Sequence, residues 1–131
     1  MSWHFVGDRP IYAQLVERIQ LKILSGEYVP GQKLPAIREF SAEAAVNPNT
    51  LQRAFEELER RGLVYTQRTA GRFISEDPNL IAELRRQYAK EALRTFIAQM
   101  QSLGYGKVDI VALVREFVGE PIQNMDEEES E

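Results

Sequence analysis

Cysteine is absent from this chain of 131 residues, and histidine occurs only once, as His4. The chain therefore has no disulfide and no cysteine ligand for a metal ion, and catalytic pairs of cysteine and histidine are excluded. The glycines stand apart from one another rather than in a phosphate-binding loop. The spaced glutamates are typical of solvated helix faces rather than of a catalytic pair. We expect a protein that is not an enzyme and that holds neither a cofactor nor a metal ion.

Long apolar runs are also missing, and none approaches the ~20 residues of a membrane-spanning helix. The first ten residues, MSWHFVGDRP, lack the basic run and the apolar core of a signal peptide. The length suits one small domain, or one domain with an appendage. These features predict a soluble, cytoplasmic protein.

Charge is distributed unevenly along the chain, which has a net charge of −4. Residues 1–77 hold ten basic and ten acidic residues, whereas residues 78–131 hold six and ten. Five of those acids lie in the last six residues, DEEESE, so the rest of the chain has a net charge of +1. The overall acidity therefore does not argue against a polyanionic partner, and residues 121–131 are expected to form an acidic, disordered tail.

Helical periodicity begins directly after Pro10. Asp8 is the expected N-cap, Pro10 is tolerated in a first turn, and Gly26 ends the pattern. An apolar residue recurs at every fourth position and gives the helix one apolar stripe of Ile11, Leu15, Ile19 and Ile23. A short helix is expected next, over residues 36–45.

The stretch VNPNTLQRAFEELERRG, Val46–Gly62, predicts the second helix of a helix-turn-helix motif. Asn47 is a good N-cap, Pro48 suits the first helical position, and Gly62 suits the end of the helix. The apolar face, which is expected to be buried, comprises Leu51, Ala54, Phe55 and Leu58.

The apolar period changes from helical to strand-like after Gly62. Residues 63–68, LVYTQR, and residues 72–75, RFIS, have the composition of short strands, with residues 69–71 as the turn of a hairpin. Three helices followed by a small hairpin describe a winged helix. The expected fold class is therefore mainly α with a small β-hairpin wing, and the winged helix-turn-helix domain should span residues 1–77.

Two further helices are expected over residues 79–103 and 108–118. The second carries too many apolar residues for one stripe on a surface helix. Two helices form no core by themselves, so residues 78–120 should be a helical dimerisation segment that packs on a second copy of the chain. The expected contact residues are Leu84, Tyr88, Phe96, Met100, Val111, Val114 and Phe117. The aromatic residues here are more typical of a dimer contact than of an effector pocket.

The first carboxylate of the helix that follows Asn47 is Glu56, in the third turn. DNA repels carboxylates, and the N-terminal part of such a helix enters the major groove in helix-turn-helix proteins. The preceding turns expose side chains that bond phosphates and base edges, namely Asn49, Thr50, Gln52 and Arg53. This gradient favours insertion into a DNA groove; the alternative is an ordinary surface helix with a chance asymmetry. Farther back, Glu56–Arg60 and Glu57–Arg61 have the spacing of ion pairs.

Resemblance to a known family covers residues 10–75, about half of the chain. The motifs PIYAQ, SGEYVPGQKLPAIRE, VNPNTLQRAFEELE and GRF resemble those of the DNA-binding domain of GntR-type bacterial transcription regulators. The two short helices that follow resemble the YtrA-type subfamily, in which such helices dimerise. The resemblance implies a homodimeric repressor that binds double-stranded DNA at an inverted-repeat operator, often that of a transporter operon.

Positions within these motifs imply contacts with DNA. Arg38 matches the family's phosphate- or base-contacting arginine, and Gly71 lies in the wing that touches the minor groove. Together with the two arginines that flank the hairpin tip, the expected DNA-binding residues are Arg38, Asn47, Asn49, Thr50, Gln52, Arg53, Arg68, Thr69, Gly71 and Arg72. Two positions depart from the family's pattern, because Ala36 replaces a frequent serine and Thr69 replaces a frequent glycine.

Two other hypotheses are compatible with the sequence. A winged helix without a role on DNA would serve as a protein-interaction module. A small-molecule effector, which the sequence does not identify, would bind where the long helix meets the winged domain and would change the spacing of two DNA-binding units.

Overall fold

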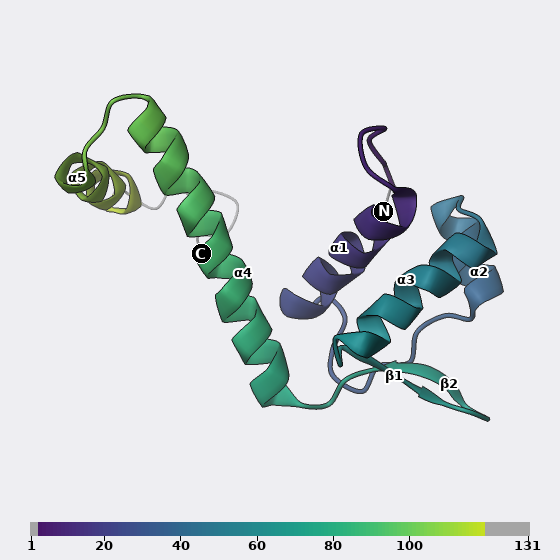
Figure 1. Cartoon of the computed structure of the whole chain (residues 1–131). Helices are drawn as coiled ribbons and strands as arrows, with labels where there is room; N and C mark the ends of the chain where they lie inside the picture. Colours follow the sequence, from purple (N-terminus) through teal and green to yellow (C-terminus); the bar gives the residue numbers. More distant parts are fainter. Residues whose placement is uncertain (1–2, 120–131) are drawn as a thin grey trace. The chain divides into compact units, whose positions relative to one another are not determined.

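The structure, a computed structural model, describes residues 3–119 and contains five helices and a two-stranded sheet in that range (Figure 1). Two compact units make up the chain, Met1–Gln87 and Tyr88–Glu131. The predicted fold class, mainly α with a small β-hairpin wing, is confirmed. The expected acidic tail, residues 121–131, lies outside the described residues.

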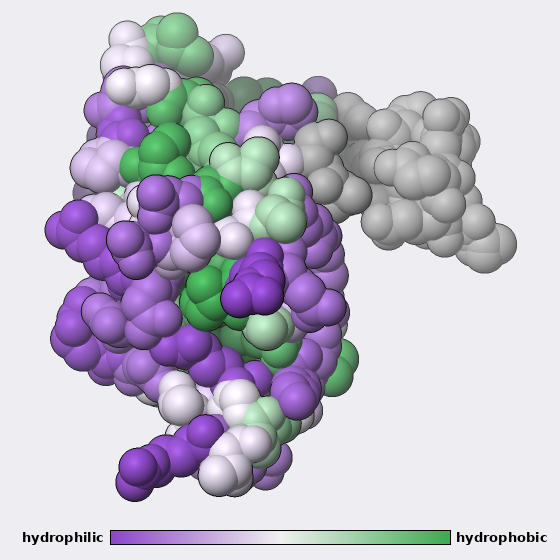
Figure 2. All heavy atoms as spheres, turned by 90° about the vertical axis from the view of Figure 1, so that its right-hand side faces the viewer, coloured by the Kyte–Doolittle hydropathy of each residue, from purple (hydrophilic) through white to green (hydrophobic). Residues whose placement is uncertain are grey.

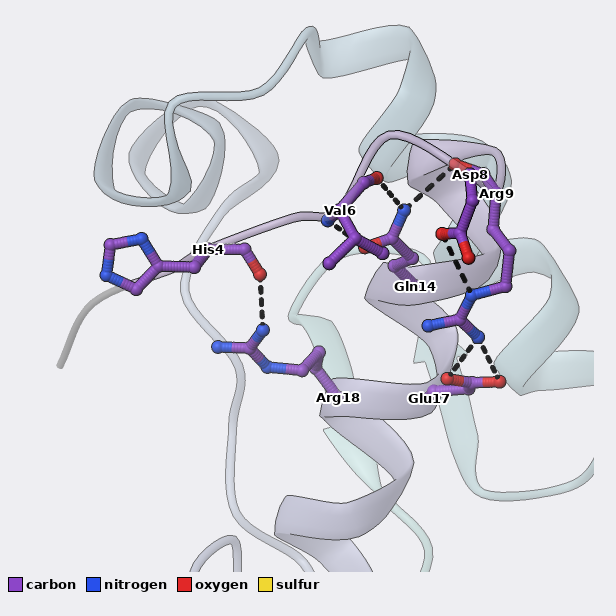
Figure 3. Close-up of polar contacts among 7 residues, drawn as sticks. All are labelled: His4, Val6, Asp8, Arg9, Gln14, Glu17 and Arg18. Carbon is purple, nitrogen blue, oxygen red and sulfur yellow. Dashed lines mark hydrogen bonds and ion pairs between the residues drawn. The ribbon is translucent and has the colours of Figure 1, made fainter.

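The N-terminal strap, defined as residues 3–9, is tied to α1 (Ile11–Leu24) by a buried glutamine of that helix. The Gln14 side chain accepts a hydrogen bond from Val6 N–H (2.9 Å) and donates to Val6 O (2.7 Å) and Arg9 O (2.9 Å) (Figure 3). A glutamine amide can satisfy a strap in this way because it carries both a donor and an acceptor. The strap is therefore held along the first turns of α1.

The start of α1 differs from the prediction. Pro10 occupies the N-cap position and no side chain caps the helix, so the prediction that Asp8 is the cap is wrong. Asp8 lies two residues before the N-cap, and its carboxylate is instead 4.0 Å from the Arg9 guanidinium. Arg9 also bonds Glu17 on α1 at 2.8 Å, which adds a second polar tie between the strap and the helix (Figure 3).

The helix-turn-helix consists of α2 (Ile37–Ala44) and α3 (Pro48–Arg60). The side-chain oxygen of Asn47 accepts a hydrogen bond from Asn49 N–H at 2.7 Å, which confirms the predicted cap of α3. Between the helices, Ala45 has a left-handed backbone with φ 58° and ends α2. This turn allows the two short helices to follow each other closely.

Trp3 of the strap packs over both α1 and α2. Its ring centroid lies 5.6 Å from that of Phe40, which is buried in the core of the first unit. The Arg18 guanidinium and the Lys22 ammonium of α1 each lie 5.4 Å from the Trp3 ring. Cation–π contacts of this kind contribute about 0.5–2 kcal/mol, depending on burial.

The core of the first unit lies where α1 packs against α3. Ile11, the first residue of the predicted α1 stripe, is 38% exposed at the start of the helix. The rest of the predicted apolar faces is buried, and comprises Leu15, Ile19, Ile23, Leu51, Ala54, Phe55 and Leu58. Burying one large apolar side chain contributes about 1.5–3 kcal/mol. The buried face of α3 therefore fixes which side of that helix meets solvent.

The wing is a hairpin of β1 (Val64–Gln67) and β2 (Gly71–Ile74). The strands are antiparallel, with Gln67 opposite Gly71. The turn is closed by a hydrogen bond of 3.0 Å from Ala70 N–H to Gln67 O. Gly71 therefore begins β2 rather than ending the turn as predicted, and its φ of 115° suits glycine.

The helix α4 (Pro78–Ser102) begins inside the first unit. Asp77 accepts a hydrogen bond from Asn79 N–H at 3.0 Å and so caps the first turn. Ile81 belongs to the core, and the Arg85 guanidinium donates to the last carbonyl of α1 at 2.8 Å. The first turns of α4 are thus part of the winged-helix unit.

The second unit contains the remainder of α4 and the helix α5 (Lys107–Val118). Ile110 is buried, but many other large apolar side chains in the described part of this unit are exposed. They are Tyr88, Leu93, Phe96, Ile97, Leu103, Tyr105, Val108, Val111, Leu113, Val114, Phe117 and Val118. Figure 2 shows one face of the molecule, on which hydrophobic and hydrophilic side chains border each other.

Two arginines of α3 and its C-cap bond the same carboxylate. Glu57 accepts hydrogen bonds from Arg60 at 2.6 Å and from Arg61 at 2.9 Å. The predicted Glu56–Arg60 pair is wrong, because Glu56 accepts a hydrogen bond from Gln52 at 3.2 Å instead. The hydrogen bonds from Arg60 and Arg61 lower the pKa of Glu57 below its ordinary value.

The Glu57 contacts predict a pH dependence of stability. Because its pKa is lower in the folded chain, the ionised carboxylate stabilises the fold above its unfolded pKa of about 4.3, and this contribution is lost as the pH falls through the folded value. We expect Glu57→Gln to be less stable than the parent at neutral pH, with a difference that shrinks in acid. Urea denaturation at neutral and acid pH measures this, with Glu83→Gln as control because the side-chain partner of Glu83 among residues 3–119 is a glutamine. An equal deficit at both pH values would contradict the prediction.

Gly62, which follows α3, predicts a local cost of adding a side chain. Its φ is 81°, and a Cβ there would lie 3.1 Å from Leu80 Cδ2. We expect Gly62→Ala to lower the free energy of unfolding by about 1–2 kcal/mol, since the left-handed backbone is strained for L-residues. Gly26→Ala tests backbone strain without a close contact, because its φ is 88° and a Cβ there would meet no atom within 4 Å. Gly7→Ala tests neither backbone strain nor a close contact. Denaturation at one protein concentration ranks the three, and equal losses in all of them would refute the argument.

Candidate nucleic-acid interface

The front of α3 is free of acids and accessible to solvent. No acidic residue lies in its first turn, and its N-terminus has the positive end of the helix dipole. Asn47, Asn49 and Arg53 are exposed, while Thr50 and Gln52 are half-buried. Although the Asn47 oxygen is used as the cap, its amide N–H groups stay available as donors. This surface can donate to phosphates and to base edges.

Gln52 and Arg53 are each held by a neighbour. Gln52 donates its amide to Glu56 at 3.2 Å, which leaves its side-chain oxygen as an acceptor. The Arg53 guanidinium carbon lies 3.7 Å from the centroid of the Tyr12 ring on α1. A guanidinium that stacks on an aromatic face keeps its N–H donors at its edge.

A hollow of about 700 Å³ separates the start of α2 from the wing. Its cationic lining residues are Lys33, Arg68 and Arg72, against the single acid Glu39. A Cβ on Gly71 would lie 3.1 Å from Lys33 Cε, so glycine allows this lysine to approach the wing closely. The excess of cations suits a hollow that receives an anionic backbone.

Arg72 joins the wing to the core. Its guanidinium carbon lies 5.2 Å from the Phe55 ring centroid, and within residues 3–119 its buried Nε has no hydrogen-bond acceptor. On the facing strand, the Tyr65 hydroxyl lies 3.4 Å from Glu76 Oε2. Partial burial, followed by the charge of Glu76, raises the pKa of Tyr65.

The remaining expected DNA-binding residues lie on α2 and in the turn of the wing. Arg38 is exposed on α2, and Ala36 gives that helix no side-chain cap. Arg68 and Thr69 are exposed in the turn of the wing. The structure thus brings the predicted residues onto α2, α3 and the wing of one unit.

The predicted dimerisation residues fall into two groups. Leu84 packs partly against the core of the first unit. The others lie in the second unit, where Met100 is half-buried and the rest are exposed: Tyr88, Phe96, Val111, Val114 and Phe117. Their part in dimerisation stays a prediction.

Sequence reasoning missed Tyr12 and Lys33 as site residues. Tyr12 belongs to the motif PIYAQ but lies far from the helix-turn-helix in sequence, and Lys33 stands in the loop before α2. Periodicity gives no signal for either contact. Within residues 3–119, no helix is long and apolar enough to cross a membrane, and no cluster of side chains has the composition of a metal site.

Comparison with known proteins identifies the family. The model described as bacterial regulatory proteins, gntR family, matches residues 11–74. The uncharacterized HTH-type transcriptional regulator YhcF of Bacillus subtilis is 38% identical over 89% of this chain and 97% of its own length. The HTH-type transcriptional repressor YtrA of the same organism is 36% identical over 75% of this chain and 76% of its own length.

Solved structures agree with these relatives. A GntR family transcriptional regulator from Listeria monocytogenes matches with a TM-score of 0.78 at 39% identity, covering 86% of this chain and 98% of that one. The DNA-binding domain of AraR in complex with operator ORX1 matches with a TM-score of 0.52 at 31% identity, covering 55% and 93%. The similarity to YtrA fits the YtrA-like subfamily. This chain therefore belongs to the gntR family of bacterial regulatory proteins, as a DNA-binding transcriptional regulator and not an enzyme.

Proposed function

We propose that the chain is a homodimeric repressor that binds an inverted-repeat operator by inserting α3 into the major groove. The observation that carries this proposal is the exposed, acid-free front of α3, in the same unit as a hollow between α2 and the wing that is lined by cations. In helix-turn-helix proteins the second helix contacts base edges with its N-terminal residues while the first crosses the DNA backbone. A repressor of this kind acts in the cytoplasm, where its operator lies.

The front of α3 supplies the sequence-specific contacts. Arg53 is suited to a guanine edge, because an arginine donates two hydrogen bonds to O6 and N7. Gln52 is suited to an adenine edge, and Asn49 and Thr50 are short enough to contact the neighbouring phosphates or bases. Asn47 stands at the positive end of the α3 dipole, where a phosphate is favoured.

Cations of α2 and of the wing supply the contacts that do not depend on sequence. Arg38 on α2 and the wing residues Arg68 and Arg72 face the DNA backbone in this arrangement. Each phosphate that a cation neutralises releases counterions and steepens the salt dependence of binding. Thr69 and Gly71 bring the backbone of the wing close to the minor groove.

The second unit supplies the dimer contact. Its exposed apolar residues, such as Val111, Val114 and Phe117, leave apolar area in water at a cost of about 25 cal/mol per Å². A second copy of the unit would bury this area in an isologous contact, which has twofold symmetry. Two α3 helices related by a twofold axis match an inverted repeat.

Repression follows from occupancy of a promoter, with no reaction catalysed. Support for a repressor comes from the similarity to YtrA, which is named as one. A transporter operon as the target, and a small-molecule effector that releases the repressor, are further predictions from the family resemblance.

The first test is selection of binding sites from a random DNA pool with purified protein at near-physiological salt, followed by sequencing. We expect enrichment of an inverted repeat, because a twofold dimer presents two identical contact surfaces. The spacing of the half-sites would then constrain the dimer. Binding without enrichment of any sequence would refute the sequence-specific operator.

The second test separates base contacts from phosphate contacts. We expect Arg53→Ala to lose about 1–3 kcal/mol of discrimination at one base position, and Arg38→Ala to weaken all DNA binding and reduce the salt slope by about 1. Fluorescence anisotropy with selected and scrambled duplexes at several salt concentrations measures both effects. Arg86→Ala is the control, since Arg86 is an exposed arginine of α4 outside the proposed surface. Unchanged binding in both test variants would contradict the assignment.

The third test concerns the dimer. Phe117 is 61% exposed, and we expect Phe117→Glu to shift the protein to monomer because a carboxylate is costly to bury in an apolar contact. The control is Lys107→Glu, which places a glutamate at the first residue of α5. This variant should stay dimeric. Sedimentation velocity over a range of concentrations distinguishes them. A parent chain that is monomeric at all concentrations would remove the homodimer from the proposal.

A further inference from the structure

Tyr12 lies beside the front of α3 although it belongs to α1. It is the second residue of α1, it is half-buried, and it packs against the core of the first unit. Its ring forms one wall of a hollow of about 260 Å³ that also includes Thr50 and Arg53. The first turn of α1 is therefore continuous with the surface proposed to contact bases.

The Tyr12 ring is the contact that holds Arg53. The guanidinium carbon lies 3.7 Å from the ring centroid, and across residues 3–119 Arg53 makes no ion pair and no side-chain hydrogen bond. The two carboxylates one turn farther along α3 have other partners. Glu56 accepts from Gln52, and Glu57 accepts from the two arginines at the end of the helix.

Holding by an aromatic ring differs chemically from holding by a carboxylate. A carboxylate occupies N–H donors of the guanidinium, as it does at Arg60 and Arg61. A ring contacts the face of the planar group and leaves the five N–H donors at its edge. The stack also restricts a side chain that otherwise has several flexible torsions. Arg53 is thus restrained and still able to donate two parallel hydrogen bonds.

We propose that Tyr12 is a positioning residue of the DNA-contacting surface, which holds the Arg53 guanidinium in the orientation that meets a base edge. The inference rests on the proposed function, in which Arg53 contacts a base. The DNA-contacting surface then extends from the helix-turn-helix to the first turn of α1. Discrimination at one base position depends on an aromatic side chain at residue 12.

The test compares four full-length variants on DNA. Tyr12→Leu removes the ring and keeps an apolar side chain, Tyr12→Phe keeps the ring without the hydroxyl, and Arg53→Ala and the double variant Tyr12→Leu/Arg53→Ala complete a cycle. Binding is measured on the selected operator and on duplexes in which each base is changed in turn. Tyr28→Leu is the matched control, because Tyr28 is another tyrosine near a cation, 5.7 Å from Lys22 Nζ, outside the hollow. Melting temperatures are recorded for all variants, and Tyr12→Met replaces Tyr12→Leu if the latter does not fold.

Tyr12→Leu is expected to lose about three- to tenfold in discrimination, as for loss of a cation–π contact, and only at the base position that Arg53→Ala affects. Tyr12→Phe and Tyr28→Leu should keep the parent's preference, and the double variant should lose no more than Arg53→Ala. If Arg53→Ala changes the preference and Tyr12→Leu does not, or if the two losses multiply, Tyr12 is a purely structural contact and the inference is overturned. If Arg53→Ala itself leaves every preference unchanged, the proposed role of Arg53 fails, and the inference falls with it.

Discussion

Packing of α1 against α3 is the constraint on which the rest of the first unit depends. Phe55 and Leu51 on α3 are fully buried, so one side of this helix packs in the core. In a helix with 3.6 residues per turn, this packing determines which residues point outward. Asn49, Gln52 and Arg53 are presented together because the opposite face is buried. The chemistry of the exposed surface is thus a consequence of how the core is packed.

The two units differ in how fully they bury apolar area. The first encloses a core that draws on α1, α2, α3, the wing and the first turns of α4. The second has two helices and leaves most of its large apolar side chains exposed in its described part. A small unit of this kind gains too little from its own packing to offset the conformational entropy of ordering it. In the proposed homodimer a second copy supplies the missing burial, and the stability of this unit then depends on protein concentration.

Local signals in the sequence predicted most of the winged helix. The cap at Asn47, the apolar period of α3 and the change of period after Gly62 each act over a few residues, and each was recovered in the structure. Contacts between distant residues were not predictable in this way. The stack of Arg53 on Tyr12 depends on the crossing of α1 and α3. Arg60 pairs with Glu57 rather than with Glu56, because Glu56 accepts a hydrogen bond from Gln52. Asp8 failed as a cap because α1 begins only at Ile11, with Pro10 at the N-cap position.

The position of Trp3 makes it an intrinsic fluorescent probe of the first unit. Trp3 is the sole tryptophan of the chain, and its ring packs on Phe40 while two cations of α1 lie over it. Indole emission depends on the polarity and charge around the ring, and with a single tryptophan this emission comes from one place only. That place is the junction of the strap with the first helix of the helix-turn-helix. A rearrangement of α2 that moves Phe40 relative to Trp3 would therefore change the tryptophan emission of the unlabelled protein.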